Sequence, residues 1–148
     1  MRPLHSKDVG FVDATGVTIA MTRQYGRAPK GERVHASAPV HNGQNVTLLG
    51  ALSCDGLRAA MTLDGSTDAQ AFVTFVQTIL VPRWRPGPIV MRDNRASHKV
   101  NGVQEAIEAV GAPLEYCPSY SPDVAPIEAC WSKCKALLRA KAARTRER

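Results

Sequence analysis

The sequence predicts an α/β protein in which one mixed sheet carries helices on both faces. The first half of the 148-residue chain holds several short strand-like segments, two of them joined by the hairpin signal Asp55-Gly56. After residue 65, segments with helical periodicity alternate with short apolar runs, which is typical of parallel strands connected by helices. This order predicts antiparallel strands first and parallel strands second.

The first half of the chain is dominated by strand patterns. The first expected strand covers residues 9–13 and ends on Asp13. Residues 22–32 contain two glycines, one proline and several basic side chains, so we expect an exposed basic loop there. Apolar and polar residues alternate well enough to indicate further strands over 33–40, 45–52 and 57–63, the last two forming an antiparallel pair.

Helical spacing marks the second half. Apolar residues between 72 and 80 recur at helical intervals, with Ser66, Thr67 or Asp68 available as the cap and Pro82 as the stop signal. We then expect a strand over 89–92, a helix over 103–110 that ends at Gly111, a strand over 114–117 and a closing helix over 125–142. The apolar stripe of the closing helix consists of Ile127, Trp131, Cys134, Leu137 and Leu138.

The length fits a single domain over residues 1–148. The net charge of +6 is concentrated near the C-terminus, where seven basic residues from Lys133 onward are accompanied by one acid, Glu147. A basic tail, at about residues 140–148, is typical of a segment that contacts a polyanion such as nucleic acid. The alternative is a solvated helix end, where basic side chains match the helix dipole.

The four cysteines show no metal-binding spacing, and no histidine pair completes a zinc set, so a structural zinc ion is not expected. The sequence has no export signal and no apolar run of about 18 residues. These features predict a cytoplasmic protein that neither is exported nor spans a membrane, and that associates with the nucleoid when it binds DNA.

Three acids are the candidate catalytic residues. Asp13 and Asp93 each end an expected strand, and Glu128 lies in the first turn of the closing helix. If the two strands are parallel neighbours, both carboxylates emerge at the edge where open α/β sheets bind ligands, within reach of Glu128. Each acid alone is also explained as a turn former or as a match to the helix dipole. Their combination favours a site.

Carboxylates that meet at one point repel each other, by roughly 4 kcal/mol per pair at about 4 Å and an effective dielectric constant near 20. Hard divalent cations remove this conflict, and ligands that are all oxygen suit Mg²⁺ or Mn²⁺. Two such ions can activate one oxygen and stabilise another in a phosphoryl displacement. The acids therefore predict a site for two divalent ions and cleavage of phosphodiesters.

Four blocks carry a family resemblance: residues 23–33, Asp93-Asn94 with Ser97-His98-Lys99, residues 118–123, and Pro126-Ile127-Glu128. In this order they resemble the catalytic core of mariner-superfamily transposases, in particular the bacterial insertion-sequence branch, over about residues 11–138. The resemblance implies a ribonuclease H-like fold and an enzyme that hydrolyses and joins DNA strands. It also implies that Asp13 and Asp93 are paired metal ligands and that Glu128 is the third acid.

Three positions depart from the family pattern. Ala14 stands where an acid is usual, Arg92 where an apolar residue precedes the second Asp, and Ala125 where Asn is usual. None of them removes a proposed ligand. Arg92 is the most unfavourable, because a charge on a central strand needs a partner or an exposed edge.

Double-stranded DNA, as element ends and target, is the partner that the resemblance implies. Basic side chains supply most non-specific affinity for its phosphates. The residues expected to contact DNA are Arg23, Arg27, Lys30, His98, Lys99, Lys133 and Lys135. The sequence ahead of Asp13 leaves no room for a helix-turn-helix domain, so we expect either a separately encoded DNA-binding half, joined by frameshifting, or a decaying remnant. A second copy of the chain, forming a homodimer, is a further candidate partner.

The first functional hypothesis is thus the catalytic domain of a transposase, which cleaves and transfers DNA strands during transposition of an insertion sequence. The second is a truncated, non-catalytic remnant that still binds DNA. A third, weaker hypothesis is a related nuclease of the same fold, such as a resolvase or ribonuclease H, which the blocks at 118–123 and 126–128 disfavour.

Overall fold

The computed structural model describes residues 9–84, 87–91, 101–117 and 126–142. Within these ranges five strands form one sheet in the order β3-β2-β1-β4-β5. The strands β1 (Gly10–Val17), β2 (Val46–Ser53) and β3 (Gly56–Asp64) pair antiparallel, whereas β4 (Ile89–Met91) and β5 (Leu114–Tyr116) extend the sheet in parallel on the other side of β1. The predicted order, antiparallel strands first and parallel strands second, is confirmed.

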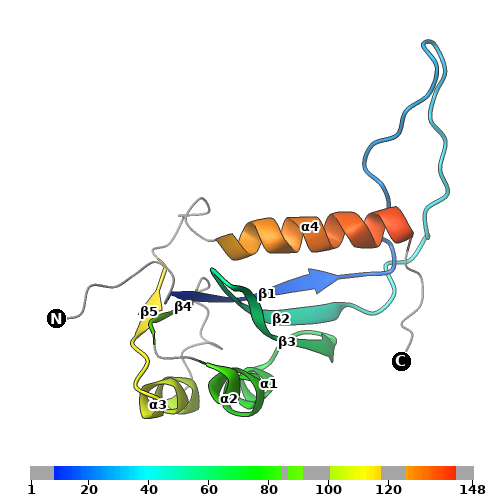
Figure 1. Cartoon of the computed structure of the whole chain (residues 1–148). Helices are drawn as coiled ribbons and strands as arrows, with labels where there is room; N and C mark the ends of the chain where they lie inside the picture. The colour runs from blue at the N-terminus through cyan, green and yellow to red at the C-terminus, as the bar shows by residue number, and fades with distance from the viewer. Residues whose placement is uncertain (1–8, 85–86, 92–100, 118–125, 143–148) are drawn as a thin grey trace.

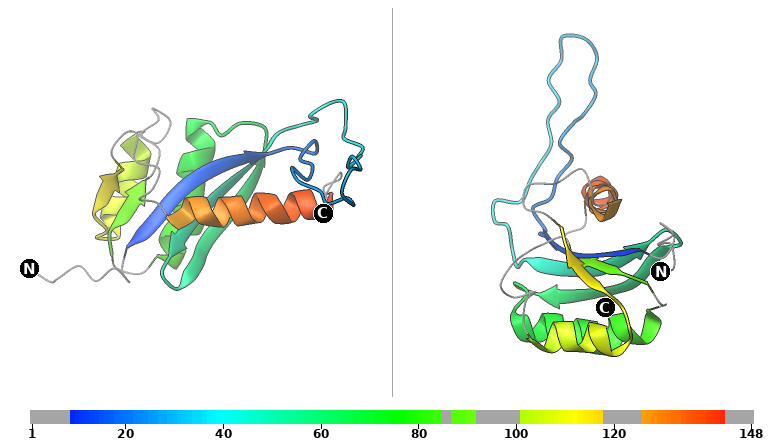
Figure 2. Two further views of the ribbon diagram at one scale, coloured as in Figure 1. Left: turned by 90° about the horizontal axis from the view of Figure 1, so that it is seen from above. Right: turned by 90° about the vertical axis from the view of Figure 1, so that its left-hand side faces the viewer.

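Helices cover both faces of this sheet, as predicted. The consecutive helical segments α1 (Ala69–Phe75), η2 (Val76–Leu80) and α2 (Val81–Arg83) lie on one face together with α3 (Asn101–Ala109). The other face is covered by α4 (Pro126–Lys141) (Figure 1 and Figure 2). Among the residues that the structure describes, no helix is both long enough and apolar enough to cross a membrane.

The larger part of the core lies between the sheet and α1, η2 and α3. Because successive side chains of a strand point to opposite faces, Val12 of β1 enters this core while its neighbours Phe11 and Asp13 face α4. A smaller cluster lies on the α4 side, where Ile127 and Trp131 are buried against the sheet. The fully buried side chains of the large core include Leu49, Phe72, Phe75, Val76, Leu80, Ile89, Val103 and Ile107.

Local chemistry explains where the first long helix begins and ends. Of the three predicted caps, Asp68 is used: its side chain accepts a hydrogen bond from the backbone N–H of Ala71 at 2.7 Å. The N–H of Val81 bonds to the carbonyl of Val76, a π-type bond directly ahead of Pro82. Pro82 has no N–H to continue the ladder, and the helix ends one residue later.

Two predictions about the first half are wrong. The first strand does not end at Asp13 but continues to Val17, so that Asp13 lies in the middle of β1. Residues 33–40 form no strand; they belong to an arm, residues 18–45, that contains neither helix nor strand and projects beyond α4 (Figure 1 and Figure 2). Alternation predicted a strand at 33–40, but a strand also needs a hydrogen-bonded neighbour, and the sheet does not extend into the arm.

The exposed basic loop predicted at residues 22–32 is confirmed as part of this arm. The two legs of the arm lie close together, since a Cβ atom added to Gly26 would lie 2.5 Å from Cγ1 of Val34. A guanidinium nitrogen of Arg23 donates a hydrogen bond to the carbonyl of Ala140 at 3.2 Å, which ties the base of the arm to the last turn of α4.

Candidate active site

Asp13 is presented by the central strand of the sheet toward α4. Its side chain is only 5% exposed, which is unusual for an acid and indicates that the surroundings hold it in place. On β2 its cross-strand partner is Gly50, which has no side chain to fill the space between the sheet and the helix. Asp13 therefore faces the first turns of α4 directly.

Trp131 fills the space above Gly50 and reaches Asp13. Its indole Nε1 donates a hydrogen bond to Oδ2 of Asp13 at 3.2 Å, between residues 118 positions apart in the chain. A Cβ atom added to Gly50 would lie 2.6 Å from Cη2 of the Trp131 ring, so the ring rests directly on the glycine backbone. The prediction that Trp131 lies in the apolar stripe of the closing helix is correct, since it is buried against the sheet, but that prediction missed the contact with the carboxylate.

Glu128 comes to the same place from the first turn of α4. Ile127, which is fully buried, and Trp131, which is 8% exposed, fix this end of the helix on Phe11, Leu48 and Leu52 of the sheet. Glu128 and Asp13 then line one cleft of about 280 Å³. The remaining lining residues are Ala14, Thr15, Trp131, Ser132 and Lys135.

Asp93 lies outside the described residues, as do Arg92, Ala125, His98, Lys99 and the block at 118–123. The condition under which Asp93 was expected near Asp13 is met, however. β1 and β4 are parallel neighbours, with Val12 opposite Met91, and Asp93 follows Met91 by two positions in the chain. The described part of β4 ends at Met91, opposite the residue that precedes Asp13 in β1.

The described part of the cleft has an oxygen-rich donor set. Carboxylate oxygens are hard donors of the kind that Mg²⁺ and Mn²⁺ prefer, and no Cys or His is among the described lining residues. Within the described ranges no three His, Cys, Asp or Glu side chains gather closely enough to hold a metal ion. Two of the three proposed ligands lie within those ranges.

Of the basic residues predicted to contact DNA, Lys135 alone among those described lines the cleft. Lys133 is exposed, and because residues two apart on a helix differ by about 200° in direction, it points away from Lys135. Arg27 and Lys30 are exposed on the arm, separate from the residues that line the cleft.

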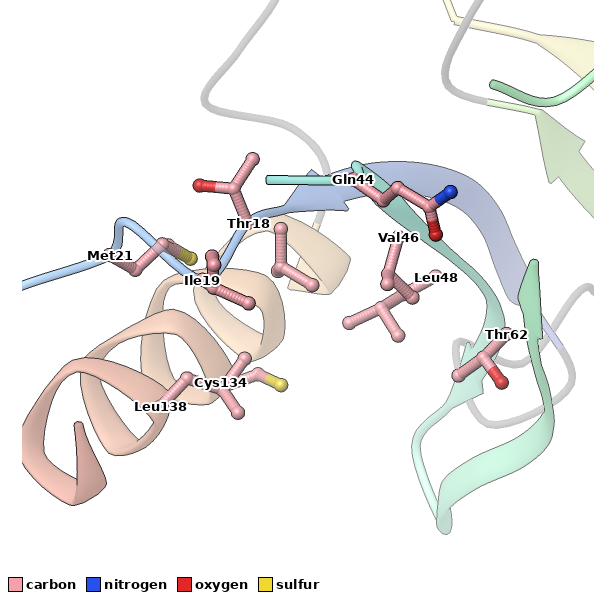
Figure 3. A pocket seen from close by; sticks show the side chains of 10 residues that line it. Thr18, Ile19, Met21, Gln44, Val46, Leu48, Thr62, Cys134 and Leu138 are labelled. Atoms are coloured by element: carbon pink, nitrogen blue, oxygen red, sulfur yellow. The ribbon is translucent and has the colours of Figure 1, made fainter. Parts of the chain in front are cut away.

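The C-terminal half of α4 packs less closely on the sheet than its N-terminal half does. An apolar groove of about 270 Å³ lies there, between the helix residues Cys134 and Leu138 and the strand residues Val46 and Leu48 (Figure 3). Leu137, predicted for the same apolar stripe, is instead 55% exposed. The acids therefore lie at the end of α4 that Ile127 and Trp131 hold firmly.

Sequence reasoning missed two features of this site: the place of Gly50 opposite Asp13, and the hydrogen bond from Trp131 to the Asp13 carboxylate. A glycine inside a strand often marks a close approach of another group, and Gly50 interrupts the apolar run of β2. Trp131 follows Glu128 by three positions, which places both on the same side of a helix. These signals indicate proximity without identifying Asp13 as the partner.

The chain is similar to a known family and to several solved structures. A family model described as DDE superfamily endonuclease matches residues 8–148. The pre-cleavage Mos1 transpososome is similar in structure, with a TM-score of 0.64 and 16% identity over 88% of this chain and 43% of that chain. The Mos1 transposase catalytic domain with raltegravir and Mg gives 0.59, with 17% identity over 89% of this chain and 63% of that chain.

A simian T-cell lymphotropic virus intasome in complex with a PP2A regulatory subunit gives a TM-score of 0.63, with 13% identity over 95% of this chain and 43% of that chain. At such identities the likeness shows the fold, and the predicted ribonuclease H-like architecture is confirmed. The chain spans 43% of the Mos1 transpososome chain that it matches. No curated protein matches the chain.

Proposed function

The chain belongs to the DDE superfamily endonuclease family, and we propose that it is the catalytic domain of a transposase, which cleaves DNA strands at the ends of an insertion sequence and transfers them to target DNA. The observation that carries this proposal is that Asp13 of β1 and Glu128 of α4 line one cleft. The parallel pairing of β1 with β4, the strand that precedes Asp93, supports it further.

We propose that Asp13, Asp93 and Glu128 are the ligands of two Mg²⁺ or Mn²⁺ ions. The oxygen donors of the cleft fit such ions, and structures of Mos1 complexes with Mg and with Mn are among those similar in fold. When bound, divalent ions supply positive charge and Lewis acidity for phosphoryl displacement. Asp13 and Glu128 approach the cleft from opposite walls, the sheet and the helix, which suits them to hold a cation between them.

Two successive displacements account for cleavage and transfer. A water molecule attacks a phosphodiester, the P–O3′ bond breaks, and a free 3′ hydroxyl results. That hydroxyl then attacks a phosphodiester of the target: a new P–O3′ bond to the transferred strand forms, the target's own P–O3′ bond breaks, and the target's 3′ oxygen leaves as a hydroxyl. The ammonium group of Lys135, at the wall of the cleft, is suited to hold a phosphate oxygen of the strand under attack.

DNA is the proposed partner, and the arm offers a second contact beyond the cleft. Arg27 and Lys30 are exposed there, and Arg23 uses one of its five N–H donors on Ala140, which leaves others for phosphate. The roles of His98, Lys99 and Lys133 stay predictions. So do the bacterial insertion-sequence branch, a separately encoded helix-turn-helix half and a homodimer.

Nicking of supercoiled plasmid in the presence of Mg²⁺ or Mn²⁺ tests the proposal. The unmodified chain is expected to convert the plasmid to the open-circular form and to lose this activity with EDTA. Asp93→Asn removes a proposed ligand while preserving size, and is expected to reduce nicking by at least about a hundredfold. Asp64→Asn, at the exposed end of β3, is the matched control and is expected to nick like the unmodified chain.

Equal nicking by the Asp93→Asn variant and the unmodified chain would refute the metal-site assignment. A folded chain that binds duplex DNA in a mobility-shift assay but does not nick it with either ion would identify the non-catalytic remnant instead. Circular dichroism and thermal unfolding of each variant establish that the comparison is made between folded proteins.

A further inference from the structure

We infer that Trp131 is a positioning residue, whose indole N–H fixes the Asp13 carboxylate for metal binding; this rests on the proposed function. The N–H lies 3.2 Å from Oδ2 of Asp13, and both side chains are buried, at 8% and 5% exposure. An indole can only donate hydrogen bonds. Trp131 therefore holds Oδ2 of Asp13 in one orientation by donating to it.

The packing around Trp131 restrains the position of its indole N–H. Its ring lies on Gly50, where any side chain would collide with it, and Gly50 is the cross-strand partner of Asp13. One helical turn earlier, the fully buried Ile127 anchors α4 on the same face of the sheet. Ring and carboxylate are thus held on one pair of strands, and the hydrogen bond restrains rotation of the carboxylate about its Cβ–Cγ bond.

The chain contains an internal control for a purely structural role. Trp84, the other of its two tryptophans, also rests on a strand glycine: a Cβ atom added to Gly10 would collide with the Cη2 atom of its ring. Its Nε1 donates to the backbone carbonyl of Gly87 at 3.1 Å, and it packs against the larger core on the other side of the sheet. Both indole rings pack on a strand glycine, but the hydrogen-bond acceptor is a backbone carbonyl for Trp84 and a carboxylate for Trp131.

Binding of Mn²⁺ to the full chain separates these roles without reference to catalysis. By isothermal titration calorimetry, Trp131→Phe, which keeps a ring but loses the N–H, is expected to raise the Kd for Mn²⁺ about tenfold, as loss of a partner that orients a ligand commonly does. Trp84→Phe is expected to leave the Kd unchanged within about twofold.

Fluorescence supplies a second measurement that leaves the Asp13–Trp131 pair intact. In the Trp84→Phe variant Trp131 is the only indole, and paramagnetic Mn²⁺ is expected to quench it saturably, with a midpoint equal to the calorimetric Kd. In the Trp131→Phe variant the remaining Trp84 is expected to show much weaker quenching. The measurement on the Trp84→Phe variant holds even if Trp131→Phe folds poorly, because Trp84→Phe retains the native Asp13–Trp131 pair.

The outcomes distinguish this inference from the proposed function. Tight Mn²⁺ binding that Trp131→Phe leaves unchanged, or saturable binding without quenching of Trp131, would overturn the positioning role alone. Failure of the unmodified chain to bind Mn²⁺ at all would overturn the metal site and the positioning role together. A tenfold weaker Kd in Trp131→Phe with preserved circular dichroism would establish the role.

Discussion

Gly50 lies opposite Asp13 on the neighbouring strand, and its missing side chain is the space that the Trp131 ring occupies. This relationship explains how a helix packs closely enough on a central strand for its indole to reach a buried carboxylate. Gly50 therefore affects two properties: how closely α4 packs on the sheet, and where the Trp131 indole lies relative to Asp13.

Gly50→Ala is expected to destabilise the protein by about 1–3 kcal/mol, because the added methyl group would lie 2.6 Å from the Trp131 ring and force it to move. Denaturant unfolding measures the loss, and the emission maximum of Trp131 in the Trp84→Phe background reports displacement of the ring. Gly102→Ala is the control. Gly102 lies in α3, and a Cβ atom added to it would lie 3.5 Å from Cγ1 of Val73 in α1, which is an ordinary van der Waals contact. An unchanged free energy of unfolding in Gly50→Ala would contradict the close packing.

The sequence predicted the sheet and its helices because their patterns are local. The hairpin of β2 and β3 follows from turn chemistry at Asp55-Gly56, and α4 follows from Pro126 and the spacing of its apolar residues. Alternation failed at residues 33–40, since a local pattern does not reveal whether a neighbouring strand exists. The end of β1 was misplaced because an acid inside a strand normally signals its end.

The site was predictable in part. Asp13 and Glu128 were expected to converge, and they line one cleft. The bond between Trp131 and Asp13 was not predictable, because it joins positions 118 residues apart and depends on the seating of α4 over Gly50. Helical spacing shows which residues share a face, whereas the partner of that face is decided by tertiary packing.

Lys135 and Lys133 are expected to differ in their effect on DNA binding, although the sequence predicted both as contacts. Lys135 lines the cleft and Lys133 points away from it. Lys135→Ala is expected to weaken binding to duplex DNA and to reduce the slope of log K against log salt by about 1, the effect of one lost phosphate contact. Fluorescence anisotropy of a labelled duplex over a range of KCl concentrations measures both quantities. Equal losses in Lys133→Ala would argue against a specific role of the cleft lysine.

Asp68→Ala is expected to destabilise the protein by about 1 kcal/mol, because it removes the side-chain acceptor for the N–H of Ala71 at the start of α1. α1 carries Phe72 and Phe75 into the larger core, so the loss is expected in global unfolding by denaturant and not only in fraying of the helix. Ser66→Ala, which changes an exposed residue just ahead of the cap, is expected to change stability by less than about 0.5 kcal/mol. Equal effects of the two substitutions would show that the cap contributes nothing.

Tyr116, on the edge strand β5, is expected to make stability fall at alkaline pH. Burial raises the pKa of its phenol above the ordinary value of 10.0, because desolvation disfavours the phenolate. In the unfolded chain the phenol loses its proton near pH 10.0, while the folded protein retains it to higher pH. The contribution of the Tyr116 phenol to the free energy of unfolding is therefore complete below pH 10.0. It is lost as the pH rises through the raised pKa of the folded state.

Thermal unfolding followed by circular dichroism across pH 10.0 measures this dependence. Tyr116→Phe is expected to show a shallower fall of the unfolding midpoint with pH than the unmodified chain, because the titrating group is absent. Tyr25→Phe changes a side chain that is 89% exposed on the arm, and it is expected to leave the dependence unchanged. A pH profile in Tyr116→Phe that parallels that of the unmodified chain would show that the alkaline loss of stability arises from groups other than Tyr116.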